Sequence, residues 1–476
     1  MLHHDTPQTR CTVGVARIDI TPPVGIYHRM WGAASHDRAT GVHKPLLATA
    51  IWMQPTSGDV SQAQVVIGMD HCVVDTADMA RLRDAVAKAA SLNSANVVIT
   101  LSHTHGSGWM SRSRAHFPGG DLIAPYLDEV ERKLGQLAQQ ARQSASPASI
   151  VYGQGRCDLA AHRDLWDEVN KQFVCGFNPA GEADDTVMVA RITAGDGKVL
   201  GTLVNYACHP TTLAWDNTAI SPDYVGAMRE TIEGATHAPC LFLQGASGDL
   251  GPREGFVGDW NVADRNGRQL GYAALSALEA LPTPGTRFVY AGPVVSGTTI
   301  GTWKHVSLES AELLGKETWS TKRFAVELPY RHDLPTLEET KAAHQEWLRA
   351  EEMARAAGDM QKARDCRAMV EQKNRQITRL TSLPAGRFLP YPVSLWQLGD
   401  ALWVAVPGEL YQVFQRTLRQ RFGDRPVVVI TLANDWQPGY LPEASTYGYG
   451  IYQETIAAVG AGALEMLTEA IAREVS

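Results

Sequence analysis

Short apolar runs rich in β-branched residues recur along the chain, and each ends abruptly at polar residues. Runs of this kind are typical of strands that are buried on both faces of a sheet. Amphipathic stretches between them have the spacing of helices. The alternation predicts an α/β fold with a mixed, mostly buried central sheet flanked by helices. The runs are residues 65–69, 96–101, 201–205, 239–244, 401–406 and 427–431, and the helical stretches include 78–90, 122–141, 225–232 and 410–421.

Residues 337–380 have a different pattern. They are rich in Ala, Glu, Lys, Arg and Gln, and a Gly-Asp pair interrupts them at 358–359. This pattern predicts a helical hairpin, which is either a solvated surface pair of helices, or a lid or homo-oligomer contact. No Pro- or Ser-rich linker divides the chain, so we expect residues 1–476 to form one domain with this excursion.

Composition and charge exclude several classes of protein. The chain has 476 residues, of which 44% are hydrophobic and 20% charged, with a formal net charge of −8. This balance excludes intrinsic disorder and argues against a nucleic-acid partner. No apolar run reaches the roughly 18 residues of a membrane span, and the first residues do not resemble a signal peptide. Seven scattered cysteines favour reduced thiols, so we expect a cytoplasmic protein.

Residues with metal-binding side chains follow several of these strands. His103 and His105 are two positions apart, so they would point to the same side of a strand. His209 and Glu409 follow two other predicted strands. Two imidazoles and a carboxylate form the usual open ligand set of catalytic zinc. Each residue also has a structural interpretation, as a packed histidine or as a carboxylate at a helix N-terminus.

Other polar positions leave their roles open. Asp249 lies on a glycine-rich loop, where it could cap a turn or contribute to a site. Asp70 and His71 form a second metal site, orient a ligand of the first, or are a buried hydrogen-bonded pair. Ser247 lacks the glycine two residues later that a nucleophile elbow requires. Phosphate-binding glycine motifs are also missing, so nucleotide chemistry has no support.

Taken together, these motifs resemble the catalytic domain of the neutral and alkaline non-lysosomal ceramidases, which are zinc amidases. The resemblance extends over most of the chain but includes no counterpart of the family's C-terminal immunoglobulin-like domain. The matching segments are residues 14–22, 38–43 (R-x-x-G-x-H), 102–106 (S-H-T-H-G), 162–164, 205–209 (N-Y-A-C-H), 221–226, 407–409 and 440–452.

The resemblance implies roles for particular residues. It places zinc (Zn²⁺) on His103, His209, Glu409 and Tyr447. His105 and Arg163 fall on the family's active-site histidine and arginine, and Asp249 falls on its active-site loop. Arg38, His43 and Arg253 are expected to contact substrate.

Departures from the family pattern affect the expected substrate. Gly251 replaces a serine, Arg253 replaces an asparagine, and Val459 stands where a second tyrosine is expected after the ligand tyrosine. Residues 337–380 have no counterpart. We therefore expect a zinc-dependent hydrolase that cleaves an N-acyl amide bond with metal-activated water, on a small molecule other than ceramide. Arg253 would favour a carboxylate-bearing substrate. The alternatives are an esterase or lactonase with the same zinc site, and a non-catalytic binding protein.

Overall fold

A twisted sheet of eight strands forms the centre of the molecule. The computed structural model describes residues 2–423 and 425–475. The order of the strands is β16-β14-β13-β9-β2-β4-β5-β7. Their bounds are β2 (Gln8–Asp19), β4 (Leu47–Gln54), β5 (Gln64–Met69), β7 (Val97–Leu101), β9 (Ser146–Arg156), β13 (Thr186–Ala194), β14 (Val199–Tyr206) and β16 (Cys240–Gln244).

A second sheet of four strands packs against the first. Its order is β20-β21-β22-β24, formed by β20 (Trp319–Pro329), β21 (Phe388–Leu398), β22 (Ala401–Ala405) and β24 (Val427–Ile430). Side chains alternate between the two faces of a strand. Val66 and Val98 of the first sheet therefore share one buried cluster with Trp403 and Val428 of the second. The core between the sheets is apolar.

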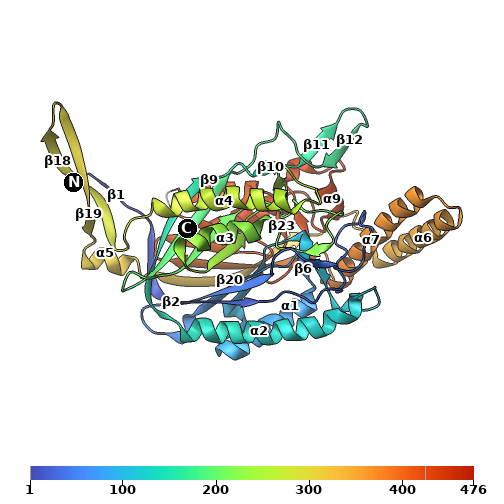
Figure 1. Cartoon of the computed structure of the whole chain (residues 1–476), viewed down its shortest axis with the longest axis horizontal. Coiled ribbons are helices and arrows are strands. Elements are labelled where there is room, and N and C mark those ends of the chain that lie inside the picture. The colour runs from blue at the N-terminus through green and yellow to red at the C-terminus, as the bar shows by residue number, and fades with distance from the viewer. Residues whose placement is uncertain (1, 424, 476) are drawn as a thin grey trace.

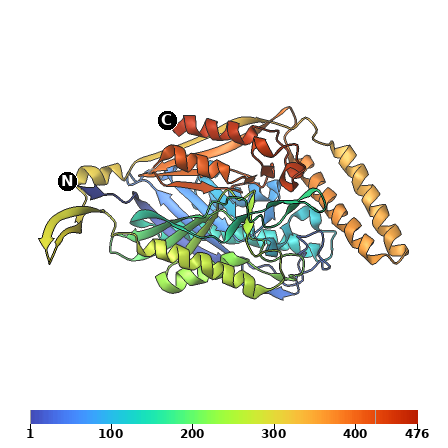
Figure 2. The same cartoon turned by 90° about the horizontal axis from the view of Figure 1, so that it is seen from above.

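Helices cover the outer face of each sheet. On the first sheet, one cluster packs under α1 (Thr76–Ala90) and α2 (Ile123–Gln143), and another under α3 (Tyr224–Thr236) and α4 (Trp260–Glu279). The outer face of the second sheet packs on α8 (Val413–Phe422) and α10 (Ala463–Val475). Figure 2 shows α8 and α10, in orange and red, across the strands from the yellow-green α3 and α4. The predicted α/β class, with a buried mixed sheet flanked by helices, is confirmed.

Most neighbouring strands of the mixed central sheet run antiparallel. Five of the seven neighbouring pairs in the large sheet are antiparallel. The parallel pairs are β14–β16 and β5–β7, at the two ends of the sheet, and β22–β24 is a third in the second sheet. Parallel strands end at the same edge, so these pairs bring the loops that follow them together.

Two hairpins project from opposite ends of the molecule (Figure 1). One is the predicted helical hairpin, formed by α6 (Leu337–Ala356) and α7 (Met360–Ser382), and the other joins β18 (Thr286–Val295) to β19 (Thr299–Ser307). All seven cysteines are free thiols. Among the described residues, no helix combines the length and the apolar character needed to cross a membrane.

Short elements complete the described chain. They are β1 (His3–His4), β3 (Gly41–Val42), β6 (Val73–Val74), β8 (Trp109–Met110), β10 (Ala160–His162), β11 (Asp164–Asp167), β12 (Gln172–Cys175), β15 (Ala219–Ile220), β17 (Leu250–Pro252), β23 (Glu409–Leu410), β25 (Tyr440–Leu441), α5 (Ser310–Gly315), α9 (Tyr452–Ile456), and the 3₁₀ turns η1 (Val60–Gln62), η2 (Ser94–Asn96), η3 (His105–Ser107), η4 (Arg112–Arg114), η5 (Gly120–Leu122) and η6 (Ala444–Thr446).

Candidate active site

Three of the predicted ligands meet where the parallel strand pairs end. His103 follows β7, His209 follows β14, and Glu409 begins β23, just after β22. Glu409 Oε2 lies 3.2 Å from His103 Nε2 and 2.9 Å from His209 Nε2. The side chains of His103 and His209 are buried, and that of Glu409 is 11% exposed. The structure therefore brings two imidazoles and one carboxylate from distant parts of the chain to a single point.

Both imidazoles are oriented by backbone carbonyls. His103 Nδ1 lies 2.9 Å from the Cys72 carbonyl oxygen, and His209 Nδ1 lies 2.7 Å from that of Ser247. A carbonyl can only accept, so each Nδ1 carries the hydrogen and donates it. The Nε2 atoms are left with lone pairs that face Glu409. Lone pairs and a carboxylate converging in a buried space form a set suited to a bound cation.

A second group could be read as a metal site but fits less well. Cys72, His103 and His105 also place ligand atoms within 4.8 Å of one another. Cys72 Sγ, however, lies 3.6 Å from His103 Nδ1, the nitrogen that already donates to the Cys72 carbonyl. This nitrogen has no lone pair to offer. The group of His103, His209 and Glu409 is therefore the better candidate.

Electrostatics within the group confirm that the carboxylate needs a positive neighbour. Burial alone would raise the pKa of Glu409, but His103 and His209 hold it well below its usual range. Burial lowers the pKa of His209 to about 4, and the charge of Arg163 acts in the same direction. Burial also opposes the charge on His103, yet Cys72 and Glu409 raise its pKa well above normal. A carboxylate kept in its charged form between two imidazoles is an arrangement that a bound cation would stabilise.

The structure places Tyr440, and not Tyr447, beside this group. Tyr440 pairs with Glu409 in the short β23–β25 ladder, and its hydroxyl lies 3.4 Å from His209 Nε2. The Tyr447 hydroxyl instead donates to the Val459 carbonyl at 2.8 Å. The expected second tyrosine fell twelve residues after Tyr447, at Val459. Tyr452 lies twelve residues after Tyr440, and the two rings are 5.8 Å apart. Tyr440 and Tyr452 therefore have the same spacing of twelve residues as Tyr447 and Val459.

The ring of His105 lies next to those of His103 and His209. Both of its ring nitrogens are buried without a partner among the described residues. Burial, followed by the effect of His103 and His209, holds the pKa of His105 well below its usual range, so the ring is neutral. Its ring centroid is 5.0 Å from that of His103 and 4.9 Å from that of Trp31.

The sequence predicted that His103 and His105 lie on one strand, but the structure places both after the end of β7. Strand β7 ends at Leu101, so His103 and His105 do not alternate along a strand. The His103 amide donates to the His71 carbonyl, and its φ is +68°. Thr104 then caps the 3₁₀ turn that begins at His105. The two ring planes consequently cross at 89°.

Arg163 is buried on the other side of Tyr440. Its Nη2 donates to the Gly248 carbonyl at 2.7 Å and to the Tyr440 hydroxyl at 3.0 Å. Burial opposes its charge, but Tyr440 and Cys175 raise the pKa of Arg163 well above normal. Its Nε has no partner among the described residues. Arg163 therefore orients Tyr440 and keeps one donor available.

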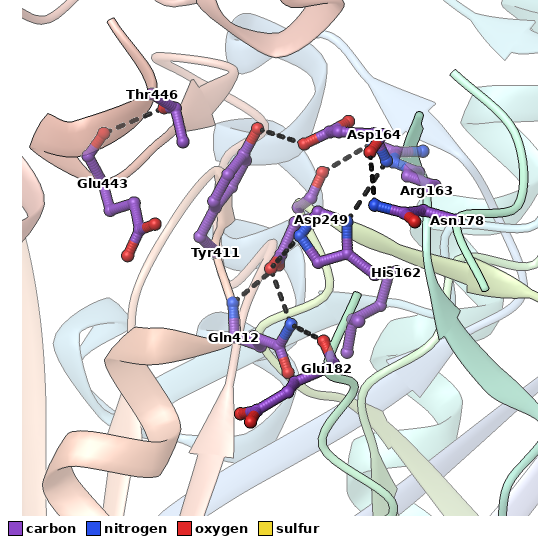
Figure 3. A network of polar contacts seen from close by, with 12 residues as sticks. His162, Arg163, Asp164, Asn178, Glu182, Asp249, Tyr411, Gln412, Glu443 and Thr446 are labelled. Carbon is purple, nitrogen blue, oxygen red and sulfur yellow. Dashed lines mark hydrogen bonds and ion pairs between the residues drawn. The ribbon is translucent and has the colours of Figure 1, made fainter. Parts of the chain in front are cut away.

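Asp249 holds the glycine-rich loop in place. Its two oxygens accept from the backbone amide of Gln412 at 2.7 Å and from the Gln412 side chain at 2.8 Å. Figure 3 shows Gln412 between Asp249 and Glu182. Burial raises the pKa of Asp249 to about 6, although Gln412 opposes the shift. These contacts attach the loop to the segment after Glu409, which makes Asp249 a positioning residue.

The position where the family has a serine is open. A Cβ built on Gly251 would lie 3.8 Å from Arg163 Cδ and 3.8 Å from Thr211 Oγ1, both ordinary contacts. Thr211 Oγ1 is itself buried without a partner among the described residues. Ser247, the nearby loop serine, accepts from the Gln244 side chain at 2.6 Å and lies on the Nδ1 side of His209. It therefore faces away from the Nε2 atoms.

Three residues expected to contact substrate lie elsewhere. Arg253 is 54% exposed and pairs with Asp158 at 3.0 Å, and Arg38 is also exposed. His43 stacks on Trp260 and bonds Ser221 at 2.9 Å. Because Ser221 in turn bonds Gly106 and Thr104, His43 supports the loop that carries His105. The structure brings none of the three into the ligand group.

Asp70 and His71 have structural partners. Asp70 binds the buried guanidinium of Arg229 through both oxygens, at 2.9 and 3.0 Å. His71 Nε2 lies 2.6 Å from the Tyr126 hydroxyl, and burial lowers the pKa of His71 to about 4. Neither belongs to a metal-binding group among the described residues. The hydrogen-bonded alternative therefore describes both residues.

Sequence reasoning missed Tyr440 and two arginines of α7. Tyr440 lay within the segment that the resemblance identified, and pairing with Glu409 distinguishes it from its neighbours. Arg375 and Arg379 are four residues apart on the predicted hairpin. Their spacing was a signal that one helix face is basic. The charged composition of the hairpin suggested a solvated face instead.

Comparisons with known proteins identify the family and the fold of the chain. Residues 11–253, about half of the chain, match the model of the family described as neutral/alkaline non-lysosomal ceramidase, N-terminal. The fold is similar to the crystal structure of neutral ceramidase from Pseudomonas aeruginosa, with a TM-score of 0.66 and 15% identity over 98% of this chain and 74% of that one. A structure described as ceramidase complexed with C2 gives a TM-score of 0.67 and 15% identity, over 99% and 76% of the two chains. The chain thus belongs to the neutral/alkaline non-lysosomal ceramidase family and has the fold of the solved neutral ceramidase.

Proposed function

We propose that this chain is a zinc-dependent hydrolase that cleaves N-acyl amide bonds. The observation that carries the proposal is the orientation of two imidazoles. Both Nδ1–H groups of His103 and His209 donate to carbonyls, so both Nε2 lone pairs point at the Glu409 carboxylate. Three ligands of this kind are the usual protein contribution to catalytic zinc.

Residues of the chain would hold the ion and complete its surroundings. His103, His209 and Glu409 would supply three ligand atoms, and the Tyr440 hydroxyl, 3.4 Å from His209 Nε2, would supply a fourth. We propose Tyr440 for that role in place of Tyr447. A zinc ion bound there would supply a Lewis acid that polarises the substrate carbonyl and makes a water more acidic.

His105 and Arg163 are placed for the remaining steps. The neutral ring of His105, with no competing hydrogen bond among the described residues, can accept a proton from the attacking water and return it to the leaving amine. Arg163 orients Tyr440 and offers a free N–H to the negative charge that develops on the carbonyl oxygen.

Gly251 and an aromatic wall define the space for substrate. Because position 251 has no hydroxyl, the nucleophile is water and not a side chain of this loop position. Trp31 stacks near His105 and meets Phe256 and Trp215 edge-on, at centroid distances of 5.7 and 6.0 Å. We propose that the acyl group lies on this wall and that the substrate is smaller than ceramide.

Metal analysis of the purified chain tests the proposal. We expect about one zinc per chain in the wild type and less than about a tenth of that in His209→Ala, because losing one ligand opens the metal shell. His332→Ala, which removes an exposed histidine, is the matched control and should keep its zinc. Unchanged zinc content in His209→Ala would overturn the ligand assignment.

Matched amide and ester substrates test the reaction. We expect an N-acyl amide to be hydrolysed by the zinc-loaded wild type and not by His209→Ala. Hydrolysis of the ester alone would favour the esterase or lactonase alternative. A chain that cleaves neither after zinc is added would favour the binding-protein alternative.

A further inference from the structure

The second helix of the hairpin brings two arginines to the metal-ligand group. Arg375 and Arg379 are one turn apart near the end of α7, so they share a face of the helix. Figures 1 and 2 show that the inner end of α7 lies against the body of the molecule, while α6 is on the outer side. The hairpin is therefore more than a solvated surface element.

The Arg379 guanidinium lies against the strand that carries Tyr440. A Cβ on Gly439 would be 3.3 Å from Arg379 Nε and 3.7 Å from its Nη2. The carbonyl of Gly439 accepts from the Glu409 amide at 2.8 Å. The Arg379 guanidinium also lies 5.4 Å from the ring centroid of Trp436. It therefore reaches the residues that form the site.

This guanidinium is buried without an acidic partner. Arg379 is only 6% exposed, its Nε is buried without a partner, and no carboxylate in residues 2–423 or 425–475 forms an ion pair with it. Burial lowers the pKa of Arg379, against the opposing effect of Tyr452, Glu409 and Tyr440. Arg114 and Arg367, by contrast, both lie next to the buried Glu371. A buried charge without a partner is costly, and an anionic ligand would compensate it.

Arg375 extends the same basic face towards His105. Its Nη2 donates to the Met30 carbonyl, its Nε is buried without a partner among the described residues, and its guanidinium lies 5.8 Å from the Trp109 ring. Its charge is close enough to lower the pKa of Tyr452, which burial raises. No carboxylate of the described chain pairs with Arg375 either.

We propose that Arg375 and Arg379 bind an anionic group of the substrate, a carboxylate, and so select charged N-acyl compounds over neutral lipids. A guanidinium presents planar, paired N–H donors that match the two oxygens of a carboxylate. The inference rests on the proposed amide hydrolysis and names its substrate class. The sequence placed the cation that binds this carboxylate at Arg253, which pairs with Asp158 in the structure. The proposal assigns that role to the arginines of the hairpin instead.

Charge-matched substrates test the proposal. N-octanoylglycine carries a carboxylate, whereas N-octanoylethanolamine has the same acyl chain and no charge. We expect the wild type to prefer the first, and Arg379→Met to lower its kcat/KM at least about tenfold, which is about 1.4 kcal/mol. The value for the neutral amide should stay within about threefold. Equal losses for both substrates would overturn the proposal, and so would an unchanged kcat/KM for every carboxylate-bearing amide tested.

A second substrate locates the charge. N-ethylsuccinamate places the carboxylate on the acyl half instead of the amine half. Loss of its hydrolysis in Arg379→Met, with the neutral amide unaffected, also supports the proposal and assigns the anion to the acyl half. Arg364→Met, on the exposed part of the same helix, is the matched control. It should leave the kcat/KM of each charged amide, relative to that of the neutral amide, unchanged.

A binding measurement separates this proposal from the hydrolase proposal. Octanoate is titrated calorimetrically into protein from which metal has been removed by chelation. We expect the Kd to be at least about tenfold weaker for Arg379→Met than for the wild type or Arg364→Met, even if no amide is cleaved. Equal affinities would contradict the anion site. Because Arg379→Met removes an uncompensated charge, its Tm should equal or exceed that of the wild type without ligand.

Discussion

At the scale of single residues, the candidate site depends on contacts that a motif does not contain. The spacing of His103 and His105 says nothing of which ring nitrogen faces the site. The carbonyls of Cys72 and Ser247 decide this for His103 and His209. His105 has no such carbonyl partner among the described residues, which leaves both of its nitrogens free. His103 and His105 therefore differ in which ring nitrogens are available, although they are only two residues apart.

Two tyrosine substitutions test the fourth ligand. Tyr440→Phe removes the hydroxyl 3.4 Å from His209 Nε2, so we expect about ten- to hundredfold weaker zinc binding. Tyr447→Phe removes only the hydrogen bond to Val459, so zinc affinity should not change and the free energy of unfolding should fall by about 1 kcal/mol. Competition with a chelator measures the affinities. Weaker binding in Tyr447→Phe alone would return the ligand role to Tyr447.

A second pair of substitutions identifies the proton-transfer group. His105→Ala should lower kcat at least about a hundredfold while zinc content stays at the wild-type level. Ser247→Ala should retain activity within about tenfold, or ~1.4 kcal/mol, because Ser247 lies on the Nδ1 side of His209. Trapping of an acyl group on Ser247, or a stoichiometric burst of released amine, would instead indicate a serine nucleophile.

Acid sensitivity should be traceable to His28. Its Nε2 donates to the Gly106 carbonyl at 2.9 Å, and burial lowers its pKa to about 4. The unfolded chain, with an ordinary histidine pKa of about 6.5, binds more protons between these values, so stability falls as the pH drops from about 6.5 to 4. Between pH 7.5 and 5 the loss from this group is about 2 kcal/mol.

The matched variant for this effect is His28→Gln, whose amide can still donate to Gly106. Chemical denaturation at the two pH values should show about 2 kcal/mol less loss for the variant than for the wild type. The same loss in both proteins would show that other groups cause the acid sensitivity.

At the scale of elements, the hydrophobic pattern predicted the buried strands, because it reflects which side chains are buried. Buried runs such as 97–101 and 427–430 are strands because their side chains contact apolar neighbours on both faces. Strand direction is set by which strands become neighbours, and no local pattern contains that information. The turn at His103 was missed for a related reason, because it depends on a bond to His71.

Packing between α3 and α4 depends on a glycine contact. A Cβ on Gly267 of α4 would lie 2.2 Å from the Tyr224 carbonyl oxygen, so Gly267→Ala should lower the free energy of unfolding by about 1–3 kcal/mol. A Cβ on Gly234 of α3 would meet no described atom within 4 Å, so Gly234→Ala should raise it by up to about 1 kcal/mol. Thermal or urea unfolding measures both. Equal effects would contradict close packing at Gly267.

At the scale of the whole molecule, the site draws on nearly the full length of the chain. His103 and His209 lie inside the segment that matches the family, whereas Glu409 and Tyr440 lie outside it. The resemblance of scattered motifs could therefore find most of the ligand group. It could not find the arginines of α7, because their position beside Gly439 depends on how the hairpin packs.

The packing of the two sheets has a consequence for how this protein would lose its metal. Two ligand histidines follow strands of the first sheet, while Glu409 follows a strand of the second. The ion would therefore bridge the two sheets and hold them together. Under mild denaturant, we expect the two sheets to separate and release the ion before either sheet unfolds. Zinc release would then measure the separation of the sheets, and circular dichroism would measure the unfolding of the strands.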